Sequence, residues 1–382
     1  MLSSILDKIK WDKFGWKLQL TILIIIFCFI LHLFRLDKPT TKEYFKNRNT
    51  LKDNQESSNL HNNNNVNKDN KNQQSQKPNL PFTIQYLTPE DSYALFKDNQ
   101  YLDKMNPSNL KARGFESKAT CVKNYTNSFQ TITDENKQNV NDLVSLMLKK
   151  LQYSPVKYLL TEILSKSKIA KCASWLEGNM PHTHQNIIVM PPFWFDSLTD
   201  EDKLTNAGST LIHELVHVEQ RFKPQKYQDL YKKWNYHKAD YIDNMEEILA
   251  LHRHNPDEDN YQWIWENNGS YYWTGAVFKD RYPTNLHNIN YLSYPVVLLD
   301  KSSANSPNLF KLKSLSTPTH LHNFTQYRNY FGVGANHYNP NEIVAQYMEN
   351  AYQSDISSGV NIDDIGDSNP GYIAFKKEFN LD

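Results

Sequence analysis

Hydrophobic residues are spread unevenly along the chain, and the first long apolar run lies close to the N-terminus. This run covers residues 18–34 (LQLTILIIIFCFILHLF) and contains polar residues only near its ends. A helix of this length is at the lower limit for spanning a bilayer. Trp11 and Trp16 precede the run, where interfacial aromatic residues are favoured. The pattern predicts one transmembrane helix, a retained signal anchor, after a short N-terminal segment of residues 1–17.

A long polar stretch follows the apolar run. Residues 35–80 contain almost no apolar side chain and predict a disordered linker rich in Asn, Lys and Gln. Lysine and arginine residues on both sides of the run slightly favour a cytoplasmic C-terminal side, whereas Asn124, Asn268 and Asn323 each begin a glycosylation sequon. The predicted localisation is a single-pass membrane protein, attached through residues 18–34, with the side of its C-terminal domain left open.

Apolar spacing typical of a folded domain resumes near Pro81, so residues 81–382 are predicted to form one domain that mixes helices and strands. A spacing near 3.6 residues predicts an amphipathic helix at residues 139–151, a main helix at 198–222 that ends at Lys223-Pro224, and a further helix at 341–352.

Two other segments of this domain have the pattern of strands. Residues 186–190 (NIIVM) predict a short buried strand that stops at two prolines. Residues 261–273 predict a β-hairpin with Asn268-Gly269 at its turn. Tyr261, Trp263 and Trp265 alternate along the first strand of this hairpin, which predicts packing in the core or across strands.

Charge and cysteine content narrow the class of protein. The chain has 42 basic and 42 acidic residues and a formal net charge of +0, so no global positive field favours nucleic acid, and none is expected as a partner. Three cysteines are too few for a disulfide scaffold. Cys121 and Cys172 can form one bridge or remain two free thiols, and the sequence leaves both possibilities open.

The strongest chemical pattern is His213-Glu214-Leu215-Val216-His217. Residues four apart lie on one face of a helix, about 6 Å apart along its axis, so both imidazoles can bind one ion. Glu214 follows the first histidine and points toward the same cleft, where it can take a proton from water. A zinc ion lowers the pKa of bound water to about 7. The pattern therefore predicts a Zn²⁺ site with His213 and His217 as ligands and Glu214 as catalytic base.

The segment TLIHELVHVEQ resembles the active-site helix of the zincin metallopeptidases. The resemblance implies an α+β zincin-like domain whose active-site helix packs on a small sheet, preceded here by the transmembrane helix and the linker. It also places the strand at residues 186–190 at the sheet edge that binds substrate in an extended form. An extended peptide or protein substrate would add to this edge through backbone hydrogen bonds.

Candidates for a third metal ligand lie farther along the chain. The metzincin pattern is excluded, because Gln220 and Phe222 stand where that branch has Gly and His. Asn341-Glu342-Ile343-Val344-Ala345-Gln346 resembles the gluzincin pattern, which implies Glu342 as the third ligand and Gln346 as an acceptor for a ligand imidazole. Gln346 departs from the Asp of many relatives, and Glu342 lies unusually far from His217. Glu246 and Glu247 are the alternatives.

Other polar residues are weaker candidates. Tyr338, with His337 beside it, precedes the helix of Glu342, and Tyr338 is the predicted catalytic group that stabilises an oxyanion. His182 and His184 share one face if they lie on a strand and can then bind metal, although a polar loop is the alternative interpretation. Arg221 can bind a substrate carboxylate or lie at a solvated helix end.

The sequence therefore predicts a membrane-anchored zinc-dependent peptidase of the gluzincin kind, which hydrolyses peptide bonds with metal-activated water. The alternative is a non-catalytic metal-binding or structural membrane protein that retains a zincin-like fold. A zinc hydrolase that acts on a non-peptide amide is a third possibility, because the chemistry is shared. Glu214 argues against a structural site, which does not need this carboxylate.

Overall fold

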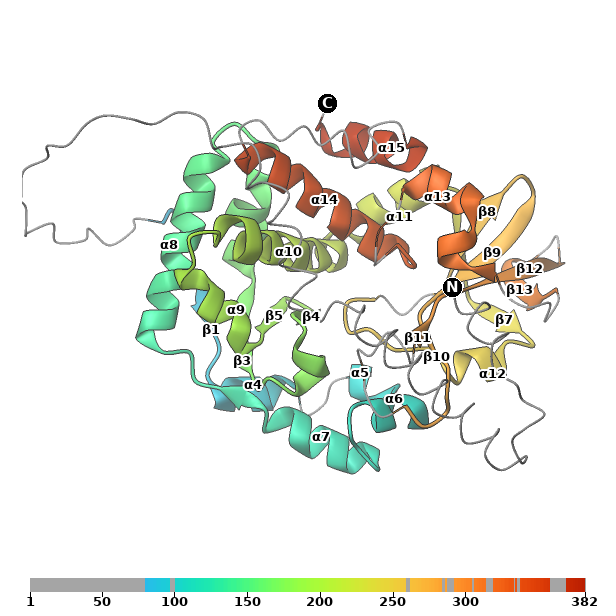
Figure 1. Cartoon of the computed structure of the whole chain (residues 1–382), viewed down its shortest axis with the longest axis horizontal. Coiled ribbons are helices and arrows are strands. Elements are labelled where there is room, and N and C mark those ends of the chain that lie inside the picture. The colour runs from blue at the N-terminus through green and yellow to red at the C-terminus, as the bar shows by residue number, and fades with distance from the viewer. Residues whose placement is uncertain are drawn as a thin grey trace, which may run out of the picture. The chain divides into compact units, whose positions relative to one another are not determined.

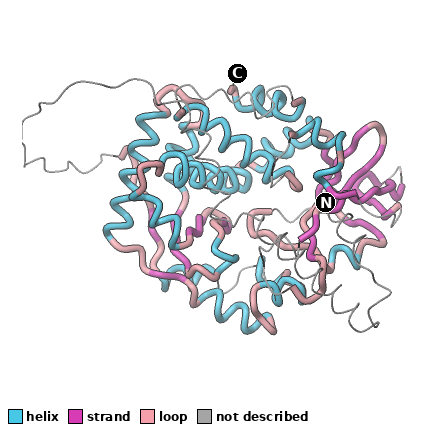
Figure 2. The backbone as a smooth tube through the Cα atoms, viewed as in Figure 1, coloured by secondary structure: helices cyan, strands magenta, loops and turns pink. Residues whose placement is uncertain are grey.

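The computed structural model describes residues 80–96, 100–258, 262–283, 286, 292–303, 306–313, 319–332, 334, 337–357 and 369–381. These residues form an α+β structure in which most strands belong to two separate sheets (Figure 1, Figure 2).

The helices carry most of the core. In chain order they are α4 (Pro89–Phe96), α5 (Gln100–Asp103), α6 (Pro107–Ala112), α7 (Lys118–Thr126), α8 (Asp134–Lys150), α9 (Pro192–Asp196), α10 (Ser209–Phe222), α11 (Pro224–Lys233), α12 (Glu246–Leu249), α13 (Thr325–Phe331), α14 (Pro340–Ile356) and α15 (Pro370–Phe379). Short 3₁₀ and π turns supplement them: η2 (Leu159–Ile163), η3 (Leu164–Lys166), η4 (Leu176–Asn179), η5 (Ser197–Thr199), η6 (Leu204–Gly208) and η8 (Leu321–Asn323).

A five-stranded sheet lies against α10. Its strands are β1 (Gln85–Tyr86), β2 (Phe129–Gln130), β3 (Lys168–Cys172), β4 (His182–His184) and β5 (Ile187–Met190). Strands β1, β3 and β5 are parallel, whereas β4 pairs antiparallel with β5 and β2 pairs antiparallel with β3. The predicted strand at 186–190 is therefore present as β5, fully buried, but β4 forms the edge beyond it.

A seven-stranded sheet is built mainly from the region that follows α12. It contains β6 (Tyr236–Ala239), β7 (Tyr241–Asp243), β8 (Gln262–Asn267), β9 (Ser270–Thr274), β12 (Pro295–Ser303), β13 (Ser306–Leu312) and β14 (Thr319–His320), while β10 (Val277–Phe278) pairs separately with β11 (Leu292–Ser293). The predicted hairpin is confirmed as β8 and β9. Asn268 and Gly269 both have positive φ, as a type I′ turn requires.

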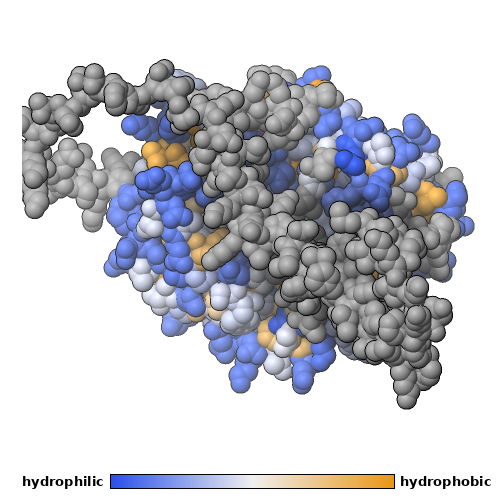
Figure 3. Space-filling view, in the orientation of Figure 1, coloured by the Kyte–Doolittle hydropathy of each residue, from blue (hydrophilic) through white to orange (hydrophobic). Residues whose placement is uncertain are grey.

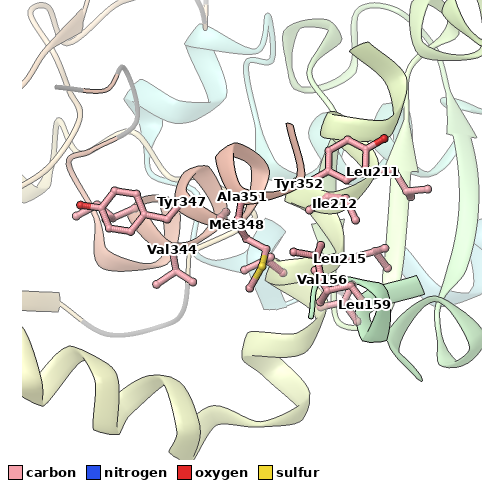
Figure 4. Close-up of a cluster of buried hydrophobic side chains, with 14 of the residues drawn as sticks. Val156, Leu159, Leu211, Ile212, Leu215, Val344, Tyr347, Met348, Ala351 and Tyr352 are labelled. Carbon is pink, nitrogen blue, oxygen red and sulfur yellow. The ribbon is translucent and has the colours of Figure 1, made fainter. Parts of the chain in front are cut away.

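Helices α10 and α14 form the centre of the larger core. Leu211, Ile212 and Leu215 of α10 are fully buried, and they pack with residues of α14 and of η2 (Figure 4). Burial of each such aliphatic side chain contributes about 1.5–3 kcal/mol. Gly208 precedes α10, and a Cβ at this position would lie 2.2 Å from the hydroxyl of Tyr352. The glycine therefore permits the close approach of α14 to the start of α10.

The ends of these helices follow local rules. Asn339 caps α14 by accepting a hydrogen bond from the Asn341 amide, and Pro340 occupies the first turn, where no amide donor is needed. Helix α10 ends at Lys223 because Pro224 restricts the residue before it. The predicted main helix therefore ends where expected but begins at Ser209, preceded by the π turn η6. The predicted helices at 139–151 and 341–352 are confirmed as α8 and α14.

The N-terminal helices pack around a second core that contains a buried ion pair. The Arg113 Nη2 atom donates to Glu177 Oε2 at 2.7 Å, and both side chains are only 3% exposed. Burial alone would raise the pKa of the Glu177 carboxyl, but the charge of Arg113 lowers it below the ordinary value. Cys121 and Cys172 lie in this core as two free thiols, and burial raises the pKa of each.

The predicted fold has to be corrected in two parts. None of the helices formed by the described residues combines the length and the apolarity that crossing a membrane demands, so the predicted transmembrane helix is not supported. Residues 18–34 and almost all of the predicted linker lie outside the described residues. That prediction used only the local hydropathy of a run at the lower length limit. The small sheet expected against the active-site helix corresponds to the five-stranded sheet, but the prediction lacked the second, seven-stranded sheet that β6, β7 and most strands after α12 form.

Exposed apolar residues are scattered over the surface of the described residues. On the face drawn in Figure 3, the hydrophobic residues among those described form only small separate patches. Isolated exposed apolar side chains, such as those of Tyr153 and Trp175, are normal on a protein surface.

Replacing Arg113 by Met should lower the free energy of unfolding by about 3–5 kcal/mol, because it leaves the Glu177 carboxylate buried without its partner. Urea denaturation followed by circular dichroism measures this loss. Adding Glu177→Leu to the same protein should recover part of the stability. Lys137→Met is the control, because its ion pair with Asp134 is exposed and should contribute little. If Arg113→Met lowers the free energy of unfolding by less than about 1 kcal/mol, the pair with Glu177 does not behave as a buried ion pair.

Candidate functional site

Helices α10 and α14 bring together three side chains from distant parts of the sequence. His213 and His217 lie one turn apart on α10, with their ring centroids 4.9 Å apart, and Glu342 lies in the first turn of α14. One nitrogen or oxygen atom from each of the three residues lies within 4.8 Å of the others. The structure thus gathers the three residues that the sequence analysis selected as a ligand set.

The donor geometry suits a zinc ion. The His213 Nε2 atom lies 3.5 Å from Glu342 Oε2, and the His217 Nε2 atom lies 3.9 Å from Glu342 Oε1. Ligand atoms at 2.0–2.1 Å from a tetrahedral zinc are about 3.3 Å apart, so a small adjustment closes the site. Within the described residues, the buried Nε2 atom of His217 has no hydrogen-bond partner. A bound metal ion would satisfy this atom, and buried polar atoms are rarely left without a partner.

The charges around this cluster favour a cation. Burial alone would raise the pKa of the Glu342 carboxyl, but the neighbouring imidazoles of His217 and His213 lower it. Burial alone would lower the pKa of His213, but the carboxylates of Glu342 and Glu349 raise it well above its ordinary value. The pKa of His217 is lowered by burial. A divalent cation among these carboxylates would compensate their charge more fully than one shared proton.

A chain of hydrogen bonds orients His217. Its Nδ1 atom lies 2.9 Å from the side-chain oxygen of Gln220, which stands one turn later on α10. The amide nitrogen of Gln220 in turn donates to the backbone oxygen of Asn341 at 2.9 Å, and Tyr231 donates to the Asn341 side chain. This arrangement fixes the ring so that Nε2 faces Glu342, as metal-binding histidines require.

The residue that orients His213 is not the one expected. Gln346 was predicted to accept a hydrogen bond from a ligand imidazole, but it donates instead to Glu349 Oε2 at 3.1 Å. It is Glu349 Oε2 that lies 3.5 Å from His213 Nδ1. Glu349 is further held by Gln353, which also donates to Ser209 at the start of α10. Glu349 carries the negative charge that Gln346 lacks, and it lies about two turns after Glu342 on the same face of α14.

Glu214 lies beside the cluster with an available carboxylate oxygen. The residue is 4% exposed, and its Oε2 atom has no hydrogen-bond partner among the described residues. Burial raises the pKa of the Glu214 carboxyl well above the ordinary value, and the charge of Asp257 adds to this effect. A neighbouring cation lowers the pKa of a carboxyl group, so a bound metal ion would favour the ionised base.

Tyr338 lies buried next to Glu342 rather than on a surface loop. Its hydroxyl accepts a hydrogen bond of 3.2 Å from the Asn255 amide, which also donates to Glu342 Oε1 at 2.7 Å. Burial raises the pKa of the Tyr338 hydroxyl well above its usual value, so it remains a proton donor. His337 is also buried, but its ring packs on Tyr347 of α14. Tyr338, and not His337, is therefore connected to Glu342, through the shared Asn255 amide.

The substrate edge predicted for residues 186–190 has to be corrected. Strand β4 lies beyond β5, so β5 is an interior strand. The edge of β4 is itself partly occupied: the Thr183 amide donates to Asp257 Oδ1 at 2.7 Å, and Arg221 bonds the Thr183 hydroxyl. Arg221 also donates to the backbone oxygens of His217 and Pro256. Arg221 therefore connects α10, β4 and residues 252–258 through hydrogen bonds. The sequence predicted instead that it binds a substrate carboxylate or lies at a solvated helix end.

Two further sets of candidates lie outside the cluster. His182 and His184 are in strand β4 rather than in a polar loop, and both contact the hydroxyl of Tyr125 in the second core. Glu246 and Glu247 are exposed on α12, where Glu246 accepts a hydrogen bond from Tyr241. The described residues give neither glutamate a place in the cluster that contains Glu342.

A small pocket of about 110 Å³ adjoins the site on the side of His217. Its lining includes Arg221 and Asp257 together with residues of α11 and Asn341 of α14. The pocket thus borders the cluster on the side where α10 meets α11.

Sequence reasoning missed Glu349, Asn255 and Asp257. Glu349 could have been found, because it lies seven positions after Glu342 and this spacing returns to the same face of a helix. Asn255 and Asp257 lie in a segment without periodic structure, and their approach to the site depends on contacts with residues far away in the sequence. No local pattern indicates these contacts.

The purified full chain should bind one equivalent of zinc. His213→Ala and Glu342→Ala should each remove bound zinc, because two remaining protein ligands are too few for a stable site. Inductively coupled plasma mass spectrometry after dialysis measures the metal content. Glu247→Ala, which changes an exposed glutamate, is the matched control and should retain the metal. Full zinc occupancy in Glu342→Ala would disprove its role as a ligand.

Glu349→Ala should weaken zinc binding by about 10- to 100-fold while leaving the ligands in place, because the His213 ring loses the carboxylate that orients it. Competition with a chromophoric chelator of known zinc affinity measures the effect. Glu135→Ala, an exposed glutamate in the first turn of α8, serves as control. Equal affinities for the wild type and Glu349→Ala would contradict this assignment.

Comparisons with known proteins do not extend this description, since no family model, no curated protein and no solved structure matches the chain.

Proposed function

We propose that this chain is a zinc-dependent hydrolase that cleaves peptide bonds, a peptidase of the gluzincin kind. The observation that carries the proposal is the cluster of His213, His217 and Glu342, with the unpartnered carboxylate oxygen of Glu214 beside it. A structural metal site does not need this additional base. A metal-assisted hydrolase does need it, because water must lose a proton as it attacks.

The protein residues would divide the work as follows. His213, His217 and Glu342 would hold the zinc ion, and Glu349 and Gln220 would keep the two imidazole rings in position. When bound, the ion would supply Lewis acidity toward the substrate carbonyl and make water easier to ionise.

Glu214 would act as general base and then as general acid. Its carboxylate takes a proton from the attacking water and passes this proton to the amine that leaves. Its burial suits the first step, because a carboxylate whose pKa is raised is a stronger base than an exposed one.

Tyr338 would stabilise the oxyanion that forms on the substrate carbonyl. Its hydroxyl is held at the Glu342 side of the cluster by Asn255, and its backbone oxygen accepts a hydrogen bond of 2.7 Å from Thr274. A proton donor fixed in this way needs little rearrangement as negative charge develops.

Glu214→Gln should abolish peptide hydrolysis while zinc content stays at the wild-type level, since the amide cannot accept the proton. The expected loss in kcat is about 10²–10⁴-fold. A quenched fluorescent peptide library, assayed with zinc-loaded protein, measures the activity. Tyr338→Phe should retain zinc and lose about 10²–10³-fold in kcat. Undiminished hydrolysis by Glu214→Gln, or no hydrolysis of any library member by the wild type, would refute the proposal.

A further inference from the structure

Residues 252–258, here called the covering segment, lie across the candidate site. In its middle, Asn255 contacts Glu342 and Tyr338, and toward its C-terminal end Asp257 binds Thr183 in the edge strand β4. The side chains of the cluster are correspondingly enclosed: His213 is 14% exposed, Glu342 4% and His217 not at all. A site that accepts the middle of a polypeptide needs a more open approach.

The covering segment is held in place from several directions. Two residues of the α6 region bind backbone groups of the covering segment. Asn109 donates to the His252 oxygen at 2.7 Å and accepts a hydrogen bond from the His254 amide. Arg113, at the C-terminal end of α6, donates to the His254 oxygen. The Pro256 oxygen accepts a bond from Arg221. Arg113 is itself fixed by its buried pair with Glu177. Such a segment is a fixed wall of the site rather than a loosely attached loop.

This wall prevents an internal stretch of peptide from pairing with β4. A substrate strand would need the amide of Thr183, which points away from β5 and already donates to Asp257. A chain end does not need this strand pairing, which favours the end of a peptide over an internal stretch as the substrate.

Arg253 indicates which end the site accepts. In the covering segment, His252 and His254 bind α6 through their backbone groups, and Arg253 and Asn255 alternate with them. Asn255 reaches Glu342 and Tyr338, so an extended chain directs Arg253 toward the same side. The Nε atom of Arg253 is buried without a hydrogen-bond partner, and among the described residues its guanidinium forms no ion pair.

Arg253 is half-buried near Glu342, and its Nε donor is unused within the described residues, so the guanidinium can bind an anion that enters the site from solvent. A carboxylate is the natural partner, because its two oxygens match the planar donors of arginine. Resting on the proposed peptidase function, we infer that the site takes peptides by their free C-terminal carboxylate, which Arg253 binds, and cleaves them close to that end.

The inference is tested first by binding, with the full-length, zinc-loaded Glu214→Gln protein and one peptide sequence of eight residues. Isothermal titration calorimetry compares the free acid, the C-terminal amide, the N-acetylated acid and a head-to-tail cyclic form. The free acid and the N-acetylated acid should bind equally well. The amide and the cyclic peptide should bind roughly 10- to 100-fold more weakly, because they lack the charged hydrogen bonds to Arg253. An amide that ends in glutamate separates a terminal carboxylate from a side-chain carboxylate.

Arg253→Met in the same background should lower the affinity for the free acid to that for the amide and leave the amide unaffected. Its thermal stability should not fall, because the removed charge has no partner within the described residues. Arg113→Met, whose charge is paired, should lower stability. Arg328→Met, which changes an exposed arginine on α13, is the control and should leave binding unchanged.

Activity assays separate this inference from the function on which it rests. With wild-type protein, mass spectrometry of the products should show cleavage next to the C-terminus of the free acid and little cleavage of the amide or cyclic peptide. Equal binding and cleavage of acid, amide and cyclic forms would overturn the inference and leave the peptidase proposal standing. Binding that depends on the carboxylate and on Arg253, without any hydrolysis, would support the binding site and refute the peptidase.

Discussion

The packing of α14 against α10 is the interaction on which the candidate site depends. Buried aliphatic and aromatic side chains of both helices meet in one core (Figure 4). Gly208 allows the helices to approach closely where α10 begins. This contact sets the position of Glu342 relative to His213 and His217. It also places Glu349 beside His213, so one packed interface determines the ligands and one of the groups that orient them.

Polar groups are concentrated where this interface opens toward β4. Glu214, Glu342 and Asn341 are all buried, which is costly unless each has a partner. Most of these partners are provided by long-range hydrogen bonds, such as those of Asn255 with Glu342 and of Gln220 with Asn341. Among the described residues, the Nε2 atom of His217 and the Oε2 atom of Glu214 are left without a partner in this region, and the proposed function uses both. This combination connects the stability of the fold with the chemistry proposed for it.

The covering segment joins the N-terminal helices to the site. Its backbone is bound by Asn109 and Arg113, while its side chains reach Glu342 and Thr183. The buried ion pair of Arg113 and Glu177 thus supports more than the second core, because it also holds the wall that restricts access to the cluster. The second core and the position of the covering segment depend here on the same residues.

The sequence by itself determined the features that depend on short-range order. The spacing of His213 and His217, the end of their helix at Pro224, the hairpin turn at Asn268-Gly269 and the helix that contains Glu342 all follow from helix periodicity, proline geometry and turn preferences. Only the tertiary structure decided that Glu342 rather than Glu247 lies beside the histidines, that Glu349 replaces Gln346 as partner of His213, and that β4 rather than β5 forms the sheet edge. These outcomes depend on which distant segments pack together, and local patterns of polar and apolar residues do not specify the pairing of segments that are far apart in the chain.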